Sequence, residues 1–388
     1  MSEWKEVALD SVAIINPRES LRKGEVVKKI AMDSLQPFVK RPTSFSLEGF
    51  NGGVKFRNGD TVVARITPCL ENGKTAYIDL LDDGEVGFGS TEYIVLREKP
   101  GVSDKQFLYY FSISPTFREV AILSMTGSSG RQRVQTEVVE KHLFDIPTLP
   151  EQKAIAAILS SLDDKINLLH RQNKTLEAIA ETMFRQWFVE EAQEDWEEKS
   201  LLDLIELVGG GTPKTSMSEY WDGDIPWLSG GDIATNHKGF VSISEKTITK
   251  AGLENSSAKL LPKFATVISA RGTVGKYCLL ASEMAFSQSN YGILPRIKDC
   301  YFFTYLLVNH VVEELQSAAY GSVFDTVTTS TFREAKFSAP PVAKVLEFED
   351  FIASYFDKKL VNQTQIRTLE KLRNNLLPKL MSGEVRVA

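Results

Sequence analysis

Disulfide pairs, membrane segments and targeting signals are all missing from this sequence of 388 residues. It has three cysteines, Cys69, Cys278 and Cys300, and none shares a Cys-x-x-Cys spacing, so a disulfide framework or a zinc site of that type is excluded. No apolar run approaches the roughly 20 residues that span a bilayer. The N-terminus lacks the basic and apolar regions of a signal peptide. We therefore expect a cytoplasmic protein with no membrane partner.

Catalytic motifs are missing as well. Gly73-Lys74-Thr75 ends like a phosphate-binding Walker A loop, but Pro68 stands where that loop requires a glycine. Gly209-Gly210-Gly211 lacks the dinucleotide-binding spacing and is expected to form a turn. Four scattered histidines show no metal-ligand spacing: His142, His170, His237 and His310. The sequence thus predicts no catalytic residue, metal site or cofactor in this chain, and we expect a protein that is not itself an enzyme.

The charges are distributed unevenly along the sequence, so the net charge alone does not decide whether the protein binds nucleic acid. A net charge of -6 by itself argues against binding to nucleic acid. Residues 16–75, however, contain 11 basic and 6 acidic residues, an excess of five, and residues 209–276 contain 8 and 6, an excess of two. Residues 190–198 carry six acids and no base. The sequence is therefore compatible with a DNA-binding face opposed by an acidic outer surface.

An internal duplication dominates the sequence. The repeated segments lie roughly 190 to 206 residues apart, which is the size of a whole domain plus a helix. They are Trp4-Lys5-Glu6 and Trp196-Glu197-Glu198, Thr61 to Arg65 and Thr266 to Arg271, Gly73-Lys74 and Gly275-Lys276, Phe88 to Leu96 and Phe286 to Leu294, and Asp164 to Glu177 and Asp357 to Glu370. Two similar surfaces in a fixed relation suit a ligand that is itself long and repeating.

Each copy predicts a mixed domain followed by a long helix. In the first copy, Thr61 to Ile66 and Tyr93 to Leu96 are expected to be strands, and Asp104 to Phe111 a helix capped by Ser103 or Asp104. From Glu151 to Val189 apolar residues recur with alternating gaps of four and three, a heptad seam typical of a coiled coil. Such a helix is about 58 Å long. The first seam includes Ile155, Leu159, Leu162, Ile166, Leu169, Asn173 and Leu176.

A second long helix follows the second copy and ends near Pro378 and Gly383. Its stripe includes Ile352, Tyr355, Ile366, Leu369, Leu372 and Leu376, and Lys359, Asn362 and Arg373 are expected to interrupt it. We predict that the two helices pack as an antiparallel coiled coil, with Asn173 fixing the register. The alternatives are that each helix packs on its own domain or pairs with a second copy of the chain. The fold class is α+β: two duplicated globular domains separated by the two helices.

Polar and basic loops supply the donors that recognise phosphates and base edges. Arg65 and Arg271 are the strongest candidates, because each follows an apolar strand at corresponding points of the two copies. Alternatively, each arginine pairs with a carboxylate of its own domain. The DNA-binding candidates are Arg41, Thr43, Lys55, Arg57, Arg65, Thr67, Lys74, Ser90, Arg131 and Arg133 in the first copy, and Thr212, Lys214, Thr215, Ser229, Asp232, Lys238, Arg271, Thr273, Lys276, Gln288, Ser289 and Asn290 in the second.

The order of domain, helix, domain and helix resembles the specificity subunit of type I restriction-modification enzymes. The motifs that carry the resemblance cover essentially the whole chain. They are Leu149-Pro150-Glu151-Gln152-Lys153, Leu162-Asp163-Asp164-Lys165-Ile166, Val208-Gly209-Gly210-Gly211-Thr212-Pro213, Ile225-Pro226-Trp227-Leu228, Ser269-Ala270-Arg271-Gly272-Thr273-Val274-Gly275, and Leu376-Leu377-Pro378-Lys379-Leu380-Met381-Ser382-Gly383-Glu384. The first copy departs from the pattern, with Ile15-Asn16-Pro17-Arg18 and Arg65-Ile66-Thr67-Pro68 in place of the glycine-containing motifs.

The resemblance implies a division of labour. Residues 1–150 and 191–342 would be target recognition domains, each reading one half of a split site in double-stranded DNA. The helices at 151–190 and 343–388, the latter with a C-terminal tail, would set the spacer and dock two modification subunits. Those subunits would bind S-adenosylmethionine and methylate adenine, and restriction subunits would add cleavage driven by ATP with Mg²⁺. Non-specific DNA binding, a coiled-coil scaffold and an unaided enzyme stay open as alternatives.

Overall fold

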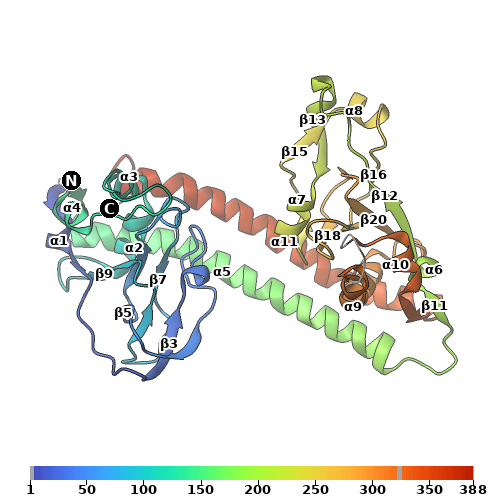
Figure 1. Cartoon of the computed structure of the whole chain (residues 1–388), viewed down its shortest axis with the longest axis horizontal. Coiled ribbons are helices and arrows are strands. Elements are labelled where there is room, and N and C mark those ends of the chain that lie inside the picture. The colour runs from blue at the N-terminus through green and yellow to red at the C-terminus, as the bar shows by residue number, and fades with distance from the viewer. Residues whose placement is uncertain (1–3, 321–325, 388) are drawn as a thin grey trace. The chain divides into compact units, whose positions relative to one another are not determined.

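The computed structural model describes residues 4–320 and 326–387, and the chain divides into two compact units. Unit 1 comprises residues 1–168 and 367–388, and unit 2 comprises residues 169–366. Both units mix helices with sheets, which confirms the α+β prediction (Figure 1). Among the described residues, no helix is both long enough and apolar enough to cross a membrane.

Unit 1 contains the first globular copy. Its elements are β1 (Lys5–Ala8), α1 (Leu9–Val12), β2 (Ala13–Ile15), β3 (Val26–Ile30), η1 (Met32–Ser34), β4 (Ser46–Gly49), β5 (Val54–Phe56), β6 (Thr61–Ala64), β7 (Thr75–Tyr77), β8 (Gly87–Gly89), β9 (Tyr93–Glu98), α2 (Lys105–Ile113), α3 (Pro115–Leu123), α4 (Thr136–Lys141) and β10 (Leu143–Ile146). They form two four-stranded sheets, in the orders β2-β9-β6-β7 and β4-β3-β8-β5, and a short β1-β10 pair.

Alternation along the strands explains the three layers of unit 1. Successive strand residues point to opposite faces of a sheet. Val63 of β6 and Ile94 of β9 therefore pack with α2, in a cluster that includes Phe107. Their neighbours Val62 and Val95 pack on the other face, with Ile30 and Phe56 of the second sheet. The β2-β9-β6-β7 sheet is thus buried on both faces.

Unit 2 contains the second globular copy. Its elements are β11 (Glu198–Ser200), α6 (Leu201–Leu204), β12 (Ile205–Gly209), η3 (Ser218–Tyr220), β13 (Trp221–Leu228), α7 (Gly230–Thr235), β14 (Phe240–Val241), β15 (Lys246–Ile248), α8 (Lys250–Glu254), β16 (Leu260–Leu261), β17 (Thr266–Ser269), β18 (Tyr277–Leu280), β19 (Met284–Phe286), β20 (Asn290–Pro295), α9 (Tyr301–Tyr320), α10 (Thr329–Glu334) and β21 (Lys336–Ser338). The sheets have the orders β12-β20-β17-β18-β14 and β15-β13-β19-β16, with a β11-β21 pair.

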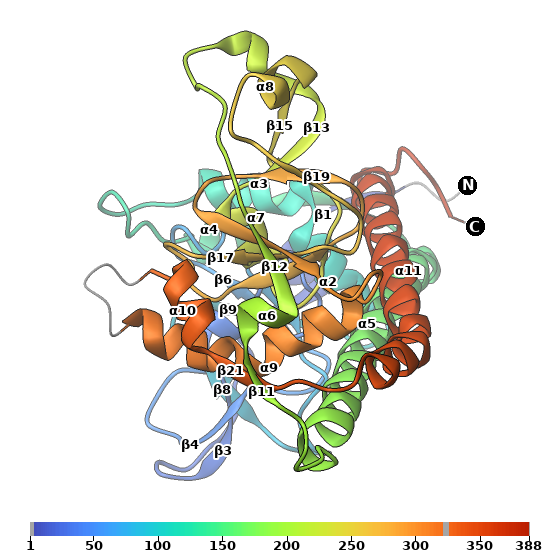
Figure 2. The same cartoon turned by 90° about the vertical axis from the view of Figure 1, so that its right-hand side faces the viewer.

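The same layering recurs in unit 2. Ile268 of β17 and Ile293 of β20 pack with α9, which lies along one face of the five-stranded sheet (Figure 2). Val267 faces the other way and packs with Leu228 and Phe286 of the second sheet. The order of the strands and of the short closing pair also repeats, from β1-β10 to β11-β21. The duplication read from the sequence is therefore a duplication of the fold.

Two long helices complete the chain. Helix α5 (Leu149–Arg185) ends in a π-helical turn, η2 (Gln186–Glu190), and α11 covers Val342–Met381. The first helix begins two residues before the predicted Glu151. The second ends at Met381, between Pro378 and Gly383, as predicted. Gly383 has a φ of +73°, the left-handed conformation that commonly follows a helix C-terminus.

The helix and strands predicted in the first copy are present, but their first and last residues differ from the prediction. The side chain of Asp104 accepts hydrogen bonds from the backbone of Gln106 and Phe107, so the expected helix cap is confirmed. Strand β6 ends at Ala64, two residues before the predicted Ile66. Ile66 forms an isolated bridge with Arg133 instead, because a loop folds back against the chain after β6.

Within unit 1 the two helices run antiparallel. Glu151, near the start of α5, forms an ion pair with Arg386, just beyond the end of α11. Asp163, three turns later on α5, pairs with Arg373, which lies earlier on α11. Residue numbers therefore rise along one helix and fall along the other, as predicted.

The pairing in unit 2 has the same direction. The Asn362 amide donates to Oδ1 of Asn173 at 2.9 Å, and Phe184 packs edge-on against Phe348. Each helix also packs on the globular part of its unit, so the pairing and the on-domain alternative are both present. The predicted seam residues lie as follows: Ile155, Leu159, Ile166, Leu169, Ile352 and Ile366 are buried, and Leu162, Asn173, Leu176, Tyr355, Leu369 and Leu376 are half-buried.

The predicted stripe of α11 is wrong at Leu372. Leu372 is 45% exposed, whereas its neighbour Arg373 is only 9% exposed. Lys359 and Asn362, also expected to interrupt the stripe, are buried. They are tolerated because α5 offers each a partner: Asp163 for Arg373, Glu177 for Lys359 and Asn173 for Asn362.

Glu349 gives unit 2 a dependence on pH. Its carboxylate, on α11, accepts hydrogen bonds from the backbone N–H groups of Phe302 and Phe303 at 2.9 and 2.8 Å, at the start of α9. Burial raises the pKa of this carboxyl from its ordinary value of 4.5 to about 7, although the two N–H groups act in the opposite direction. The folded state therefore holds a proton that the unfolded state has lost, and its stability falls as the pH rises from about 4.5 to about 7.

We predict that Glu349→Gln removes this loss of stability. The glutamine keeps an acceptor oxygen for the helix start and carries no charge. Relative to the natural chain, the free energy of unfolding of the variant should rise by on the order of 2 kcal/mol between pH 5 and pH 8. Urea unfolding at the two pH values measures this difference. A difference that stays constant with pH would contradict the assignment.

Candidate nucleic-acid interface

Three loop segments of unit 1 meet at one end of the β2-β9-β6-β7 sheet. The segment after β6 begins at Arg65, whose backbone N–H donates to Glu92 in the β8–β9 loop at 2.9 Å. Val134, at the end of the loop that follows α3, donates to the carbonyl of Arg65, also at 2.9 Å. Thr67 in turn donates to the carbonyl of Gln132 at 3.0 Å. These bonds bring five candidates, Arg65, Thr67, Ser90, Arg131 and Arg133, into one set of loops.

Unit 2 builds the equivalent end with two of the same backbone bonds. Ala270 donates to the carbonyl of Ser289 at 3.0 Å, and Val327 donates to the carbonyl of Ala270 at 3.1 Å. The Thr273 hydroxyl bonds to the carbonyl of Gly230 at 3.2 Å, which adds the start of α7 to the cluster. The candidates gathered here are Thr212, Ser229, Asp232, Arg271, Thr273, Lys276, Gln288, Ser289 and Asn290.

Comparison of the strand pairing in the two units corrects the expected match between Arg65 and Arg271. Ala64 pairs with Tyr93 as Ser269 pairs with Asn290, so Arg65 corresponds to Ala270 and not to Arg271. A shift of one residue along an extended segment turns a side chain to the opposite face. Arg65 is accordingly half-buried, with Nη2 3.4 Å from the carbonyl of Val134, whereas Arg271 is exposed.

The arginines and lysines of unit 1 divide by their partners. Arg133 binds both carboxylate oxygens of Glu92, which lowers the pKa of that carboxyl. Arg41 pairs with Asp79 and Asp164, and Arg57 with Glu19. Lys55 and Lys74 donate to the carbonyls of Glu19 and Met32. Arg41, Arg57 and Arg133 are therefore paired with carboxylates of unit 1. Arg65 and Arg271, for which such pairing was the alternative, form no ion pair with a carboxylate among the described residues.

Several candidates lie away from the loop cluster. Arg57 precedes β6, whereas Arg65 follows it, so the two lie at opposite ends of that strand. Arg41 in unit 1 and Lys238 in unit 2 are bound to α5, through Asp164 and Glu181. Thr43 donates to the carbonyl of Ser34 in another loop.

Arg271, Lys276, Lys214 and Arg131 keep their charges available. None of them forms an ion pair with a carboxylate among the described residues. Arg271, Lys214 and Arg131 are exposed, and Lys276 is half-buried. Free guanidinium and ammonium groups on loops are the groups that bind phosphates and guanine edges.

The glycines before Thr212 allow a close approach of two backbones and do not form the expected turn. Gly209 ends β12, and residues 210–214 form no turn, helix or strand. A Cβ on Gly210 would lie 2.2 Å from the carbonyl oxygen of Ser287, and one on Gly211 would lie 2.2 Å from the carbonyl carbon of Ser257. This approach brings the Thr212 hydroxyl onto Gln288. Other side chains of this loop cluster are held in place: Ser229 and Asp232 form a capping box at α7, and the buried Asn290 donates to Ser287. Thr215 is exposed. In unit 1, Ser90 accepts a hydrogen bond from the backbone of Glu92.

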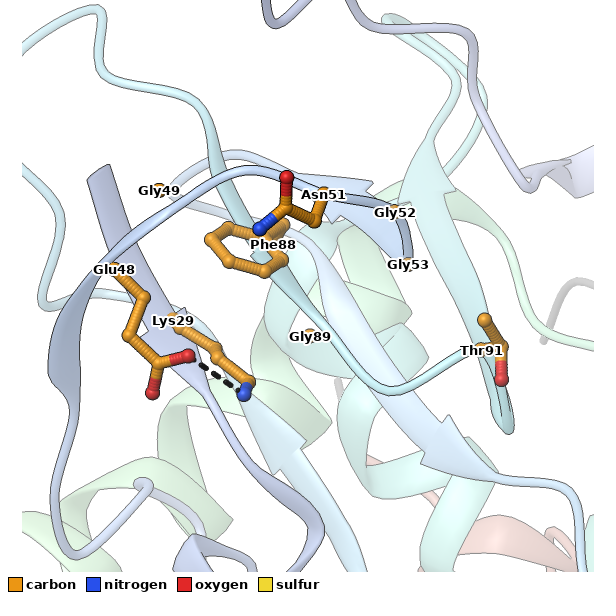
Figure 3. Close-up of a pocket in the computed structure, with 9 residues that line it drawn as sticks. All are labelled: Lys29, Glu48, Gly49, Asn51, Gly52, Gly53, Phe88, Gly89 and Thr91. Atoms are coloured by element: carbon orange, nitrogen blue, oxygen red, sulfur yellow. Dashed lines mark hydrogen bonds and ion pairs between the residues drawn. The ribbon is translucent and has the colours of Figure 1, made fainter. Parts of the chain in front are cut away.

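A pocket of about 430 Å³ that the sequence did not predict lies on the second sheet of unit 1 (Figure 3). Lys29 and Glu48 form an ion pair of 2.9 Å on one side of it, and Phe88 and Asn51 lie beside them. Gly53, with a φ of +113°, has no room for a side chain because a Cβ would meet the carbonyl of Gly89 at 2.1 Å. In the sequence, Asn51-Gly52-Gly53 is typical of a turn and is a signal for this part of the pocket.

The loop clusters of unit 1 and unit 2 are held by related backbone hydrogen bonds and carry different side chains. The chain belongs to the family of the type I restriction modification DNA specificity domain, whose model matches residues 1–178 and 193–377. In the described residues, no group of three or more His, Cys, Asp or Glu side chains could hold a metal ion.

Individual relatives agree with this assignment. The chain is 23% identical to the type I restriction enzyme HindI specificity subunit of Haemophilus influenzae, over 85% of this chain and 87% of that protein. It is 28% identical to the MjaIX specificity subunit of Methanocaldococcus jannaschii, over 50% of this chain and 45% of the relative. A solved S subunit of a type I restriction-modification system from M. genitalium has the same fold, with a TM-score of 0.59, 16% identity and coverage of 97% and 96% of the two chains.

We predict that Arg271→Ala weakens binding to the DNA half read by unit 2 by ~1–3 kcal/mol and leaves the other half unaffected. The measurement is a titration of duplexes in which either half is scrambled. Lys298→Ala is the matched control: Lys298 is exposed and follows the far end of β20, away from Asn290 and the loop cluster. An equal loss at both halves, or an equal effect of the control, would contradict a contact by Arg271.

Proposed function

We propose that this chain reads a split DNA site for a type I restriction-modification enzyme, one half with each globular domain. The observation that carries this proposal is that the loop clusters of the two units are held by equivalent backbone hydrogen bonds. Two backbone hydrogen bonds of these loops repeat at equivalent positions, while the side chains differ, as Arg65 and Ala270 do. A repeated frame with different donors suits the recognition of two different sequences on one duplex.

The helix pair is proposed to set the spacer between the two halves and to dock two modification subunits. A groove of about 500 Å³ on the outer face of α5 supports docking, and it is lined by Lys174, Thr175, Ala178, Ile179, Thr182 and Met183. Other apolar side chains on the pair are exposed, among them Leu168, Val361 and Leu372. Apolar groups clustered on a helix face favour association with partner helices.

Catalysis and cofactor binding are proposed to belong to the partners. The modification subunits would bind S-adenosylmethionine and methylate adenine, and restriction subunits would add cleavage driven by ATP with Mg²⁺. The chain itself would act without catalysis, through recognition and assembly.

A selection from randomised duplexes tests the proposal and its alternatives. The expected result is two conserved half-sites separated by a fixed spacer, with an affinity that falls as the salt concentration rises. Salt-dependent binding without half-sites would favour a non-specific DNA-binding protein. No salt-dependent affinity would favour a coiled-coil scaffold. Methylation by this chain alone would favour an unaided enzyme.

Shortening both helices by one heptad should shorten the preferred spacer by about three base pairs, since seven helical residues span about 10 Å. The deletion removes matching residues of α5 and α11, so that the antiparallel register is preserved. The control replaces the same residues without changing the length. Selection of duplexes with varied spacers gives the result, and an unchanged preference would rule out the spacing role.

Ile179→Asp should weaken docking of the modification subunits at least tenfold, about 1.4 kcal/mol, because it places a charge in the groove on α5. Ile243→Asp is the control, since Ile243 is 70% exposed in a loop of the globular part of unit 2. Co-purification and titration with the modification subunits measure the effect. Retained docking in Ile179→Asp would show that the partner binds elsewhere.

A further inference from the structure

A tyrosine, an acid and a base meet in the interior of unit 1. The hydroxyl of Tyr110, on α2, donates to Oδ2 of Asp163 on α5 at 2.6 Å. The other oxygen of Asp163 accepts from Nη1 of Arg373 on α11 at 2.7 Å. All three residues are at most 9% exposed. One carboxylate thus joins the globular domain to both long helices.

A second set with the same composition lies in unit 2. The hydroxyl of Tyr305, on α9, donates to Oε1 of Glu177 on α5 at 3.2 Å. Oε2 of Glu177 pairs with Nζ of Lys359 on α11 at 2.9 Å. Lys359 also donates to the carbonyl of Lys238 in the globular domain at 2.6 Å. We call these two sets the unit 1 triad and the unit 2 triad.

The duplication does not account for the second triad. The repeat aligns Asp164 with Asp357, so the counterpart of Asp163 is Phe356, a buried residue in an apolar cluster. The acids of the two triads therefore do not correspond to each other in the repeat. In both units the acid nevertheless comes from α5 and the base from α11.

The chemistry of the triads differs from that of the seams around them. Apolar contacts are non-directional and tolerate small rotations of one surface on another. A buried carboxylate is costly unless its donors stay in place, and charge-assisted hydrogen bonds require short, well-aligned geometry. Burial and the neighbouring carboxylate both raise the pKa of the Tyr110 and Tyr305 hydroxyls, so both stay protonated as donors. A triad therefore restrains the orientation of a domain on its helices more tightly than leucines can.

We propose that the two triads are positioning groups that fix the angle of each recognition domain on the helix pair, and so narrow the range of DNA spacers that the protein accepts. The proposal rests on the proposed reading of a split site. The tyrosines act through the helices and touch no DNA. A domain that rocks on its helices would still recognise its own half-site and would accept halves that are one base pair closer or farther apart.

The test compares Tyr110→Phe with Tyr109→Phe in the full chain with its modification subunits. Both residues are buried on α2, but the Tyr109 hydroxyl has no hydrogen-bond partner in the described part of the chain, so its removal leaves the triad intact. Duplexes carry the selected site with its natural spacer or with one base pair removed or added, and a further duplex carries a single half. Tyr305→Phe, with Tyr301→Phe as its control at the start of α9, repeats the test in unit 2.

We expect Tyr110→Phe to bind the single half within about twofold of the natural chain. Its preference for the natural spacer over the shifted spacers should fall at least fivefold, whereas Tyr109→Phe should keep the full preference. An unchanged preference in Tyr110→Phe, an equal loss of affinity for all duplexes, or the same effect of Tyr109→Phe would overturn the positioning role. If the natural chain itself selects no split site, the proposed function fails first, and that outcome is visible before any variant is compared.

Discussion

The pairing of α5 with α11 is the constraint on which the rest of the chain depends, because neither globular domain has a complete core without both helices. In unit 1, Ile155 and Leu159 of α5 and Leu377 and Leu380 of α11 belong to the same buried cluster as α2. In unit 2, Phe184 of α5 and Phe348 and Ile352 of α11 lie in the cluster that holds α9. The helices are thus part of each domain and also the connection between them. A change in the pairing of α5 with α11 would therefore disturb the core of each domain.

The two copies share their sheets and differ in the elements that surround them. The sheets, their strand order and the backbone hydrogen bonds that bring the loops together repeat, since these bonds satisfy groups that cannot be left unpaired in a core. The differences include added elements: α3 in unit 1, and η3, α7, β14 and α8 in unit 2. Unit 1 also neutralises more of its basic candidates internally, as Arg133 does with Glu92, while Arg271 of unit 2 stays unpaired among the described residues. Two domains of common descent therefore offer different sets of donors.

The sequence predicts best what depends on periodicity. The heptad pattern of α5 and the repeat itself identified the α+β architecture and the antiparallel helices, since apolar spacing follows from which face is buried. It failed where the tertiary partner decides. Arginine and lysine usually face solvent on a helix. Arg373 and Lys359 lie in the interior because α5 supplies a carboxylate partner for each of them. The alignment of Arg65 with Arg271 was wrong by one position because pairing register along a strand is set by partner strands that the local sequence does not name. Which loop residues touch DNA stays a prediction.

The late position of α11 in the chain has a consequence for synthesis. Leu377, Leu380 and Met381 complete the core of unit 1, yet they are made roughly 230 residues after β10 closes the rest of that domain, a delay on the order of 10–50 s at about 5–20 residues per second. The core of the first domain therefore cannot be completed until α11 has been synthesised. A chain truncated before α11 (Val342–Met381) would lack part of the core of both units.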